Sequence, residues 1–466
     1  MLFSSITFLY YFLPIVFVLY FIAPKSAKNI VLLCASLLFY AWGEPRYILL
    51  MLTVIVAGYC SGLFLMSCSK NSYKKIILGL SILFNICVLA YFKYGDFLIV
   101  NWNYVMKSDV SLLDIALPIG VSFYIFQMLS YLIDVYRGKV KAQKNIINLA
   151  LYISMFPQLI AGPIVRYELI EKQLNNRTHS VSNIAIGVRR FVLGLGKKVL
   201  VANVLGELCE TFKVSDDRSV LFFWFYAFAY TLHIYFDFSG YSDMAIGLGK
   251  IFGFDYPENF DYPYISQSIT EFWRRWHMTL GTWFRDYVYI PLGGNRVAKW
   301  RWLFNVLVVW MITGLWHGAA WNFVLWGLYF AVLLIIEKLW LLRYLEKGSW
   351  WNHIYTMFFV VMGFVIFNAD SVHDIGTNIG GLFGFASYPL CSEEFIYYFK
   401  SYIMIFVIAV VGATPLPRKL INVVCRAEKG RQLLQVLEVI GLVFVMLVAT
   451  GYLVDGSFNP FLYFRF

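Results

Sequence analysis

The stretch WMITGLWHGAAWNFVLW, residues 310–326, is apolar almost throughout and holds a single ionisable side chain, His317. In a bilayer such a stretch favours a helix, because a helix satisfies its backbone hydrogen bonds without water. An ionisable side chain at that depth is costly, so it usually faces a cavity and has a function there. His317 is therefore the first candidate for a functional residue.

Similar apolar stretches recur along the whole chain of 466 residues, of which 60% are hydrophobic and only 14% charged. A soluble domain of this length cannot hide that much apolar surface, and stretches of roughly 17–25 apolar residues are long enough to cross a bilayer. Aromatic residues make up 20% of the chain, as expected when Trp and Tyr rings settle at lipid interfaces. We predict an all-α polytopic membrane protein with roughly eleven to thirteen crossings, plus re-entrant and interfacial helices.

The net charge of +11 would suggest nucleic acid as a partner in a soluble protein. Here the basic residues fall between apolar stretches, so we expect them to set the topology and contact anionic lipid, with no nucleic-acid partner. Lys25 and Lys28 follow the first apolar segment, and further basic loops follow the third and fifth. The positive-inside rule puts these loops in the cytoplasm, and both chain ends, including the tail 455–466, outside.

No soluble domain is visible, so residues 1–466 are expected to form one integral membrane domain. The longest polar interruption, 254–301, is predicted to be an interfacial or re-entrant segment that carries the active site. Within it, Ser268 and Glu271 have the spacing of a helix capping box. A second interfacial helix is predicted over 184–206, because this segment carries four basic residues. These are Arg189, Arg190, Lys197 and Lys198.

One further histidine and one pair of polar residues bear on function, and the cysteines bear on metal binding. His277 lies in the interrupted segment, 40 residues before His317. His233 and Asp237 are four residues apart and share a helix face, which favours a hydrogen-bonded buried pair over a metal or proton site. Seven cysteines without a C-x-x-C pair suggest neither a disulfide framework nor a zinc site, and no metal is expected.

A buried imidazole is neutral, because desolvation disfavours its cation. A neutral imidazole can take a proton from a hydroxyl as a general base. The sequence offers no serine elbow or Walker loop, which favours direct transfer from an activated acyl donor such as a thioester. Four arginines are candidates to hold the donor's phosphates, with lipid headgroup binding as the alternative for each. They are Arg274, Arg275, Arg285 and Arg296.

Five motifs between residues 117 and 330 resemble the membrane-bound O-acyltransferase (MBOAT) family, and among its branches the bacterial polysaccharide O-acetyltransferases. They are LPIGVSFY (117–124), FPQLIAGPI (156–164), FDFSGYSDMA (236–245), the block from Trp273 to Asn295, and GLWHG (314–318). The resemblance implies a ring of membrane helices around a funnel or tunnel in a bacterial cytoplasmic (inner) membrane. The family's invariant histidine falls on His317, and its second polar position falls on His277.

The resemblance further implies that acetyl-CoA, as a substrate rather than a bound cofactor, donates an acetyl group from the cytoplasm for an extracellular polysaccharide. An extracellular partner of the SGNH-hydrolase type completes delivery in this branch. The tail NPFLYFRF (459–466) is similar to a motif whose tyrosine is proposed as an acyl relay, which falls on Tyr463; an aromatic tail packed at the interface is the alternative.

Three alternatives to acetyl transfer remain open. The first is D-alanyl transfer from a carrier protein to teichoic acid. The other two are not enzymatic: a transporter with a buried proton-relay histidine, and a scaffold for the extracellular transferase.

Overall fold

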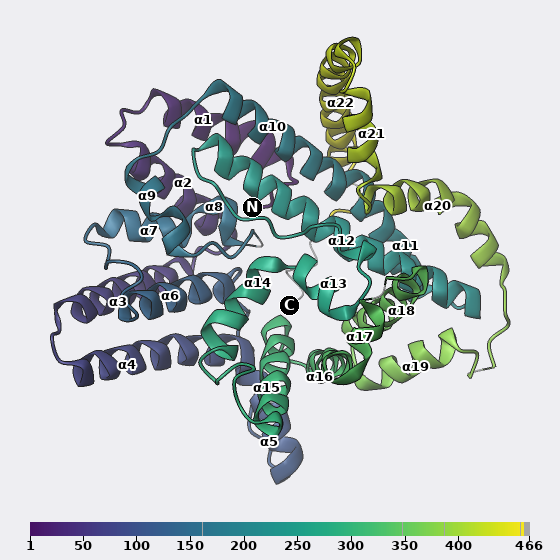
Figure 1. Cartoon of the computed structure of the whole chain (residues 1–466), viewed down its shortest axis with the longest axis horizontal. Helices are drawn as coiled ribbons and strands as arrows, with labels where there is room; N and C mark the ends of the chain where they lie inside the picture. Colours follow the sequence, from purple (N-terminus) through teal and green to yellow (C-terminus); the bar gives the residue numbers. More distant parts are fainter. Residues whose placement is uncertain (161, 347, 386, 457, 461–466) are drawn as a thin grey trace. The chain divides into compact units, whose positions relative to one another are not determined.

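The computed structural model describes residues 1–160, 162–346, 348–385, 387–456 and 458–460. Within these ranges the chain forms helices and no strand. It divides into two compact units, the first made of Met1–Phe191 and Met244–Pro257, the second of Val192–Asp243 and Glu258–Phe466. Two of the three boundaries fall inside helices, α10 and α12, and the third follows Pro257 in the connection after α12 (Figure 1). The expectation of one domain over residues 1–466 stays a prediction.

The first unit contains the N-terminal helices and parts of α10 and α12. Its elements are η1 (Thr7–Phe12), α1 (Leu13–Ile22), α2 (Lys28–Gly43), α3 (Ile48–Ser67), α4 (Asn71–Leu89), η2 (Ala90–Tyr94), α5 (Gly95–Met106), α6 (Val121–Tyr136), α7 (Ile146–Ser154), α8 (Phe156–Leu159), α9 (Tyr167–Asn175), most of α10 (Val181–Gly196) and the end of α12 (Val220–Ile251).

The second unit contains most of α12 and everything that follows Pro257. Its further elements are η3 (Lys197–Ala202), α11 (Asn203–Val214), η4 (Pro263–Ile265), α13 (Ile269–Arg275), α14 (Met278–Phe284), η5 (Arg285–Tyr289), α15 (Lys299–His317), α16 (Trp321–Ile336), η6 (Glu337–Leu341), α17 (Leu342–Leu345), α18 (Trp350–Asn368), α19 (Val372–Leu382), α20 (Glu393–Gly412), α21 (Leu416–Val424) and α22 (Glu428–Val454).

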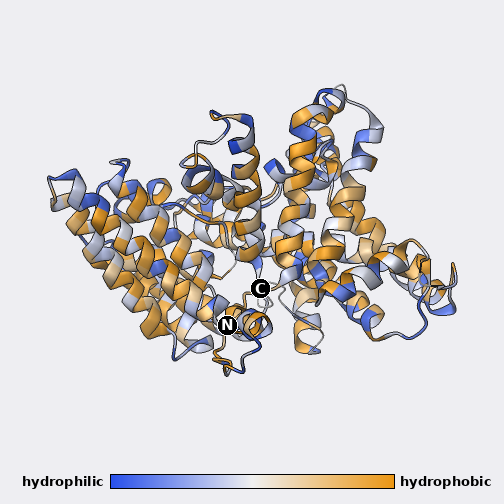
Figure 2. Ribbon diagram, turned by 90° about the horizontal axis from the view of Figure 1, so that it is seen from below, coloured by the Kyte–Doolittle hydropathy of each residue, from blue (hydrophilic) through white to orange (hydrophobic). Residues whose placement is uncertain are grey.

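Seven helical segments of the described chain are long and apolar enough to cross a membrane, and three shorter apolar helices accompany them. The seven are Ile48–Ser67, Asn71–Met106, Val220–Ile251, Trp321–Leu345, Trp350–Asn368, Glu393–Gly412 and Glu428–Val454. Figure 2 shows helices that are coloured largely hydrophobic, with hydrophilic residues frequent in the connections between them. The all-α polytopic class is thus confirmed, whereas the count of eleven to thirteen crossings stays a prediction.

Small residues set the closest helix contacts in both units. In the first unit, a Cβ atom added at Gly187 of α10 would lie 2.6 Å from the carbonyl oxygen of Gly247 in α12. In the second unit, a Cβ at Gly314 of α15 would lie 2.2 Å from the carbonyl oxygen of Phe323 in α16. Glycine is required where backbones approach this closely, as is common between membrane helices. The Gly314 contact positions the end of α15, where His317 lies.

The start of α13 confirms the predicted cap and adds a buried carboxylate. Ser268 Oγ accepts the backbone N–H of Glu271 at 3.0 Å. The fully buried Glu337 of η6 accepts the backbone N–H groups of Ile269 and Thr270 at 2.7 and 2.8 Å. The first N–H groups of a helix have no hydrogen-bond partner within the helix. These bonds therefore stabilise a helix that is too short to be stable in isolation. Glu337 thereby fixes α13 beside α16.

Candidate functional site

The two predicted catalytic histidines line one cavity in the second unit, with a volume of about 760 Å³. Its walls come from α13, α14, η5, α15 and the α16–η6 region. Most of the lining is aromatic or aliphatic, including four tryptophans: Trp273, Trp276, Trp302 and Trp310. A largely apolar cavity with a few polar groups is the usual form of a small-molecule site. The sequence prediction that 254–301 contributes to the site is consistent with this lining.

His277 occupies the break between α13 and α14 with a left-handed backbone, φ 45°. Its Nδ1 lies 3.2 Å from Asn259 Oδ1, and Asn259 Nδ2 in turn donates to Ser242 Oγ at 3.1 Å. Because the Asn259 oxygen accepts, His277 Nδ1 carries the proton and Nε2 carries the lone pair. Nε2 is buried and has no hydrogen-bond partner among the residues that the structure describes.

Burial lowers the pKa of His277 to about 3. The imidazole is therefore neutral throughout the physiological pH range. A positive φ at a residue other than glycine costs free energy and is found disproportionately at functional sites. Together, the fixed tautomer and the neutral charge leave His277 ready to accept a hydrogen bond or a proton at Nε2.

His317 is the last residue of α15 and is 7% exposed. Its ring lies edge-on to Trp326 and Phe367, with centroid distances of 5.0 and 5.2 Å. The Trp316 ring contacts both imidazoles, 4.8 Å from His317 and 5.8 Å from His277. The aromatic rings fix the orientation of the His317 imidazole and leave it accessible from the cavity.

The structure brings two of the four predicted donor-binding arginines to the cavity. Arg274 and Arg285 line it, and Arg285 also pairs with Asp286 at 2.7 Å. Arg275 instead pairs with Glu271 and Asp261, and neither Arg275 nor Arg296 is among the lining residues.

Sequence reasoning missed Lys338 of η6, a third cation in the lining. It also missed Asn259, which no motif distinguishes from other loop asparagines. The described lining holds three cations and no carboxylate, so its charge suits an anionic ligand.

The predicted His233–Asp237 pair is replaced by two separate contacts. His233 Nδ1 donates to the carbonyl oxygen of Ala202 at 2.6 Å. Asp237 pairs with Lys198, and both of these side chains are only 1% exposed. Lys198 is therefore not an interfacial residue as predicted for 184–206, because its ammonium lies inside the unit against a carboxylate. Lys197 likewise pairs with Asp243 at 2.7 Å.

The chain's tail enters this buried polar group. Lys198 Nζ donates to the carbonyl oxygen of Pro460, and Asn203 Nδ2 donates to Asn459 Oδ1 at 3.1 Å. Phe458 packs beside Gly206, where an added Cβ would meet its ring at 3.0 Å. Tyr463, the predicted acyl relay, lies outside the described residues. No group of three or more His, Cys, Asp or Glu side chains able to hold a metal occurs in the described part of the chain.

Helices long and apolar enough to span a membrane, together with a two-histidine cavity in the second unit, define an integral membrane protein with a candidate site for proton transfer. The chain belongs to the membrane-bound O-acyltransferase family, whose pattern matches residues 139–373, and it is an acyltransferase. It is 42% identical to a probable alginate O-acetylase of Pseudomonas syringae pv. tomato, over 84% of this chain and 76% of that protein.

Two further relatives widen the comparison. A peptidoglycan O-acetyltransferase of Helicobacter pylori is 34% identical over 84% of this chain and 81% of its own length. A teichoic acid D-alanyltransferase of Bacillus subtilis is 30% identical over 55% of this chain and 69% of its own. The family and enzyme predictions are thus confirmed.

Proposed function

We propose that the protein transfers an acetyl group from cytoplasmic acetyl-CoA to an acceptor hydroxyl. The acetyl group serves the O-acetylation of an extracellular cell-wall polysaccharide or exopolysaccharide. The observation that carries the proposal is the cavity itself, which is lined by His277, His317 and three cations without a carboxylate. Cations suit the phosphates of coenzyme A, and the apolar walls suit its acyl end. Relatives named for alginate and peptidoglycan O-acetylation support the polysaccharide acceptor.

In the proposed step, His317 is the general base. It takes the proton from an acceptor hydroxyl, whose oxygen attacks the thioester carbonyl carbon as an ester C–O bond forms. The carbon–sulfur bond breaks, and the thiolate of coenzyme A takes the proton back from the imidazolium. General-base assistance of this kind contributes about 10²–10⁴ in rate. The lone pair at His277 Nε2 accepts a hydrogen bond from a donor or acceptor group in the cavity.

The tail supports a relay through Tyr463 as part of the same proposal. Pro460 is held by Lys198, which pairs with Asp237. The next residue in α12, Phe238, packs its ring 4.6 Å from His277. The anchor of the tail therefore lies one residue from a side chain of the active site. We propose that the Tyr463 hydroxyl receives the acyl group and passes it to an extracellular partner of the SGNH-hydrolase type.

Base-labile groups on isolated cell envelopes test the proposal. Mild alkali releases ester-linked acetate, which is measured together with released D-alanine in the wild type, His317→Ala and the control His373→Ala. His373 is exposed and distant in sequence from the cavity lining. We expect His317→Ala to lose nearly all released acetate at equal membrane abundance, with the control unchanged.

Two results would reject the acetylation proposal. Release of D-alanine in place of acetate would favour the teichoic acid alternative, which the Bacillus subtilis relative supports. Unchanged acetate in His317→Ala would favour a scaffold or transporter. For the relay, Tyr463→Phe should abolish polymer acetylation, while the exposed-tyrosine control Tyr397→Phe should retain it. Full polymer acetylation in Tyr463→Phe would exclude the relay through Tyr463 and favour direct transfer to the acceptor hydroxyl.

A further inference from the structure

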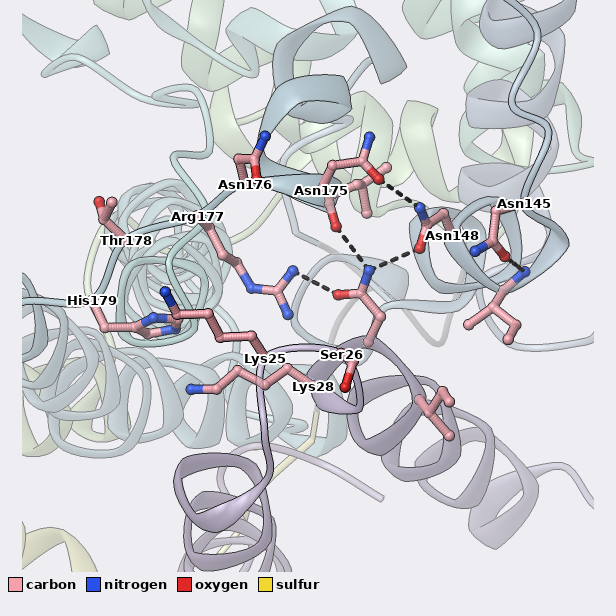
Figure 3. Close-up of a pocket in the computed structure, with 14 residues that line it drawn as sticks. Lys25, Ser26, Lys28, Asn145, Asn148, Asn175, Asn176, Arg177, Thr178 and His179 are labelled. Atoms are coloured by element: carbon pink, nitrogen blue, oxygen red, sulfur yellow. Dashed lines mark hydrogen bonds between the residues drawn. The ribbon is translucent and has the colours of Figure 1, made fainter.

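A second, strongly basic pocket lies in the first unit, with a volume of about 470 Å³ (Figure 3). It is formed by the α1–α2 connection, the start of α7 and the segment between α9 and α10. Four of its lining residues carry basic side chains: Lys25, Lys28, Arg177 and His179. The two-histidine cavity and its proposed chemistry do not use any of these residues.

No carboxylate balances this charge within the described chain. The lining includes neither Asp nor Glu. None of the ion pairs of the described residues involves Lys25, Lys28 or Arg177. Burial and the neighbouring charges of Lys28 and Arg177 lower the pKa of His179. The part of this shift that comes from Lys28 and Arg177 reflects the same uncompensated positive charge that the lining shows, and such charge favours an anion.

Arg177 is held in place by the protein before any ligand arrives. Its Nε donates to the Tyr20 hydroxyl at 2.8 Å, and its Nη1 donates to Asn29 Oδ1 at 2.6 Å. Asn29 is fixed in turn, because its Nδ2 donates to Asn148 Oδ1 and to the Leu174 carbonyl oxygen, both at 2.8 Å. Figure 3 labels Arg177 and Asn148 and draws hydrogen bonds between the lining residues as dashed lines. A fixed guanidinium loses little further entropy when it binds an anion.

One donor of this guanidinium is unused. Arg177 Nη2 is buried and has no hydrogen-bond partner among the described residues. A buried donor without a partner is destabilising, and a ligand oxygen that reaches Nη2 would satisfy it. Lys25 and Lys28 line the same pocket, and the Lys28 ammonium lies 4.6 Å from the centroid of the Tyr20 ring, whose hydroxyl accepts from Arg177. The two lysines therefore add positive charge to the pocket that holds the guanidinium.

The pocket lies at the end of a lipid-facing helix. α1 ends at Ile22, which is 80% exposed, and Leu19 and Phe21 of the same helix are also exposed. Lys25 follows Ile22 by three residues, which places the basic group where an apolar helix surface meets polar surroundings. Basic pockets at such positions bind lipid headgroups.

We propose that the pocket of Lys25, Lys28, Arg177 and His179 binds a phosphate group, supplied by the headgroup of an anionic phospholipid. A free phosphate ester has the same recognition chemistry and is the other source that the experiment distinguishes. The site is separate from the catalytic cavity, and the proposal does not depend on which acyl group the enzyme transfers.

The test measures lipid binding to the purified full-length protein by native mass spectrometry. The lipid probes are phosphatidylglycerol and, for comparison, zwitterionic phosphatidylcholine. The pocket variant is Lys25→Gln/Lys28→Gln. The matched control is Lys70→Gln/Lys75→Gln, which removes the same charge from two exposed lysines after the end of another apolar helix, α3. A third variant, Arg177→Lys, keeps the charge but cannot reproduce the guanidinium geometry.

A basic residue near anionic lipid contributes about a factor of five in affinity, so the pocket variant should bind phosphatidylglycerol about 25-fold more weakly. The control lysines do not line the pocket, so their loss should weaken phosphatidylglycerol binding clearly less than the pocket variant does. Phosphatidylcholine should bind more weakly than phosphatidylglycerol. If millimolar inorganic pyrophosphate or adenosine 3′,5′-bisphosphate displaces phosphatidylglycerol, the pocket binds phosphate and its ligand is a soluble phosphate ester. If neither compound displaces the lipid, the ligand is the lipid headgroup. Equal effects of pocket and control variants on every probe would overturn the proposal.

Discussion

Replacing Lys198 by methionine removes the ammonium that lies between the Asp237 carboxylate and the Pro460 carbonyl oxygen. Both members of the ion pair are 1% exposed, so water cannot replace the lost partner. Leaving one member of a buried pair without the other costs about 3–5 kcal/mol. The Pro460 carbonyl also loses a donor, which adds about 1 kcal/mol. We therefore expect Lys198→Met to lower the free energy of unfolding by about 4–6 kcal/mol.

The double variant Lys198→Met/Asp237→Leu separates charge from packing. It removes the orphaned carboxylate and should be more stable than Lys198→Met by about 3 kcal/mol. Reversible unfolding in mixed micelles with an increasing fraction of SDS measures both free energies. Asn203→Ala serves as the control, because it removes one neutral hydrogen bond to Asn459 and should cost only about 1 kcal/mol.

Two results would refute this reasoning. A cost below about 1 kcal/mol for Lys198→Met would mean that the charge is solvated and the pair is not buried. A double variant no more stable than the single one would mean that the orphaned carboxylate is not the source of the cost. The double variant also tests the tail, because a stable protein that lacks the Lys198 donor should still transfer less acetyl if Pro460 must be anchored.

Three further predictions concern the packing and the protonation of the site. Gly314→Val should lower the free energy of unfolding by about 2–3 kcal/mol, since the new side chain meets the Phe323 carbonyl oxygen in α16. Glu337→Ala should cost about 3 kcal/mol or more, because two N–H groups at the start of α13 lose their acceptor. His277→Asn should leave the acid limb of the activity–pH profile unchanged between pH 5 and 8, because a pKa of about 3 keeps His277 neutral there.

Matched controls make each of these results interpretable. Gly441→Val places the same side chain in α22, where no atom lies within 4 Å of an added Cβ, and should change stability little. Glu207→Ala removes an exposed carboxylate and should cost under about 0.5 kcal/mol. An acid limb that moves in His277→Asn would show that His277 titrates near neutral pH and is more hydrated than its burial indicates.

The helical class and the candidate site residue His317 could be predicted from the sequence because each follows from a local rule. Long apolar stretches give helices in lipid, and Ser268 caps α13 as its spacing predicts. His317 was identified because an ionisable residue in an apolar stretch is costly. Each of these inferences depends only on residues that are close together in the sequence.

What the sequence could not provide depends on residues far apart in the chain. Lys198 meets Asp237 and Pro460 across 39 and 262 residues, and a basic residue in an amphipathic segment is indistinguishable locally from one at a lipid interface. Asn259 fixes the tautomer of His277 only because a left-handed turn brings them together. Arg275 has the same motif context as Arg274, yet neighbouring acids hold it in ion pairs.

The proposed function requires that the His317 imidazole acts in acyl transfer between the two sides of the membrane. Inverted membrane vesicles, with the cytoplasmic face outward, test it when they are supplied with radiolabelled acetyl-CoA and base-labile label is counted on the polymer in their lumen. We expect steady labelling with the wild-type protein and a loss of at least about 100-fold with His317→Ala at equal abundance. Equal labelling with both proteins, or label that never reaches the lumen of wild-type vesicles, would contradict it.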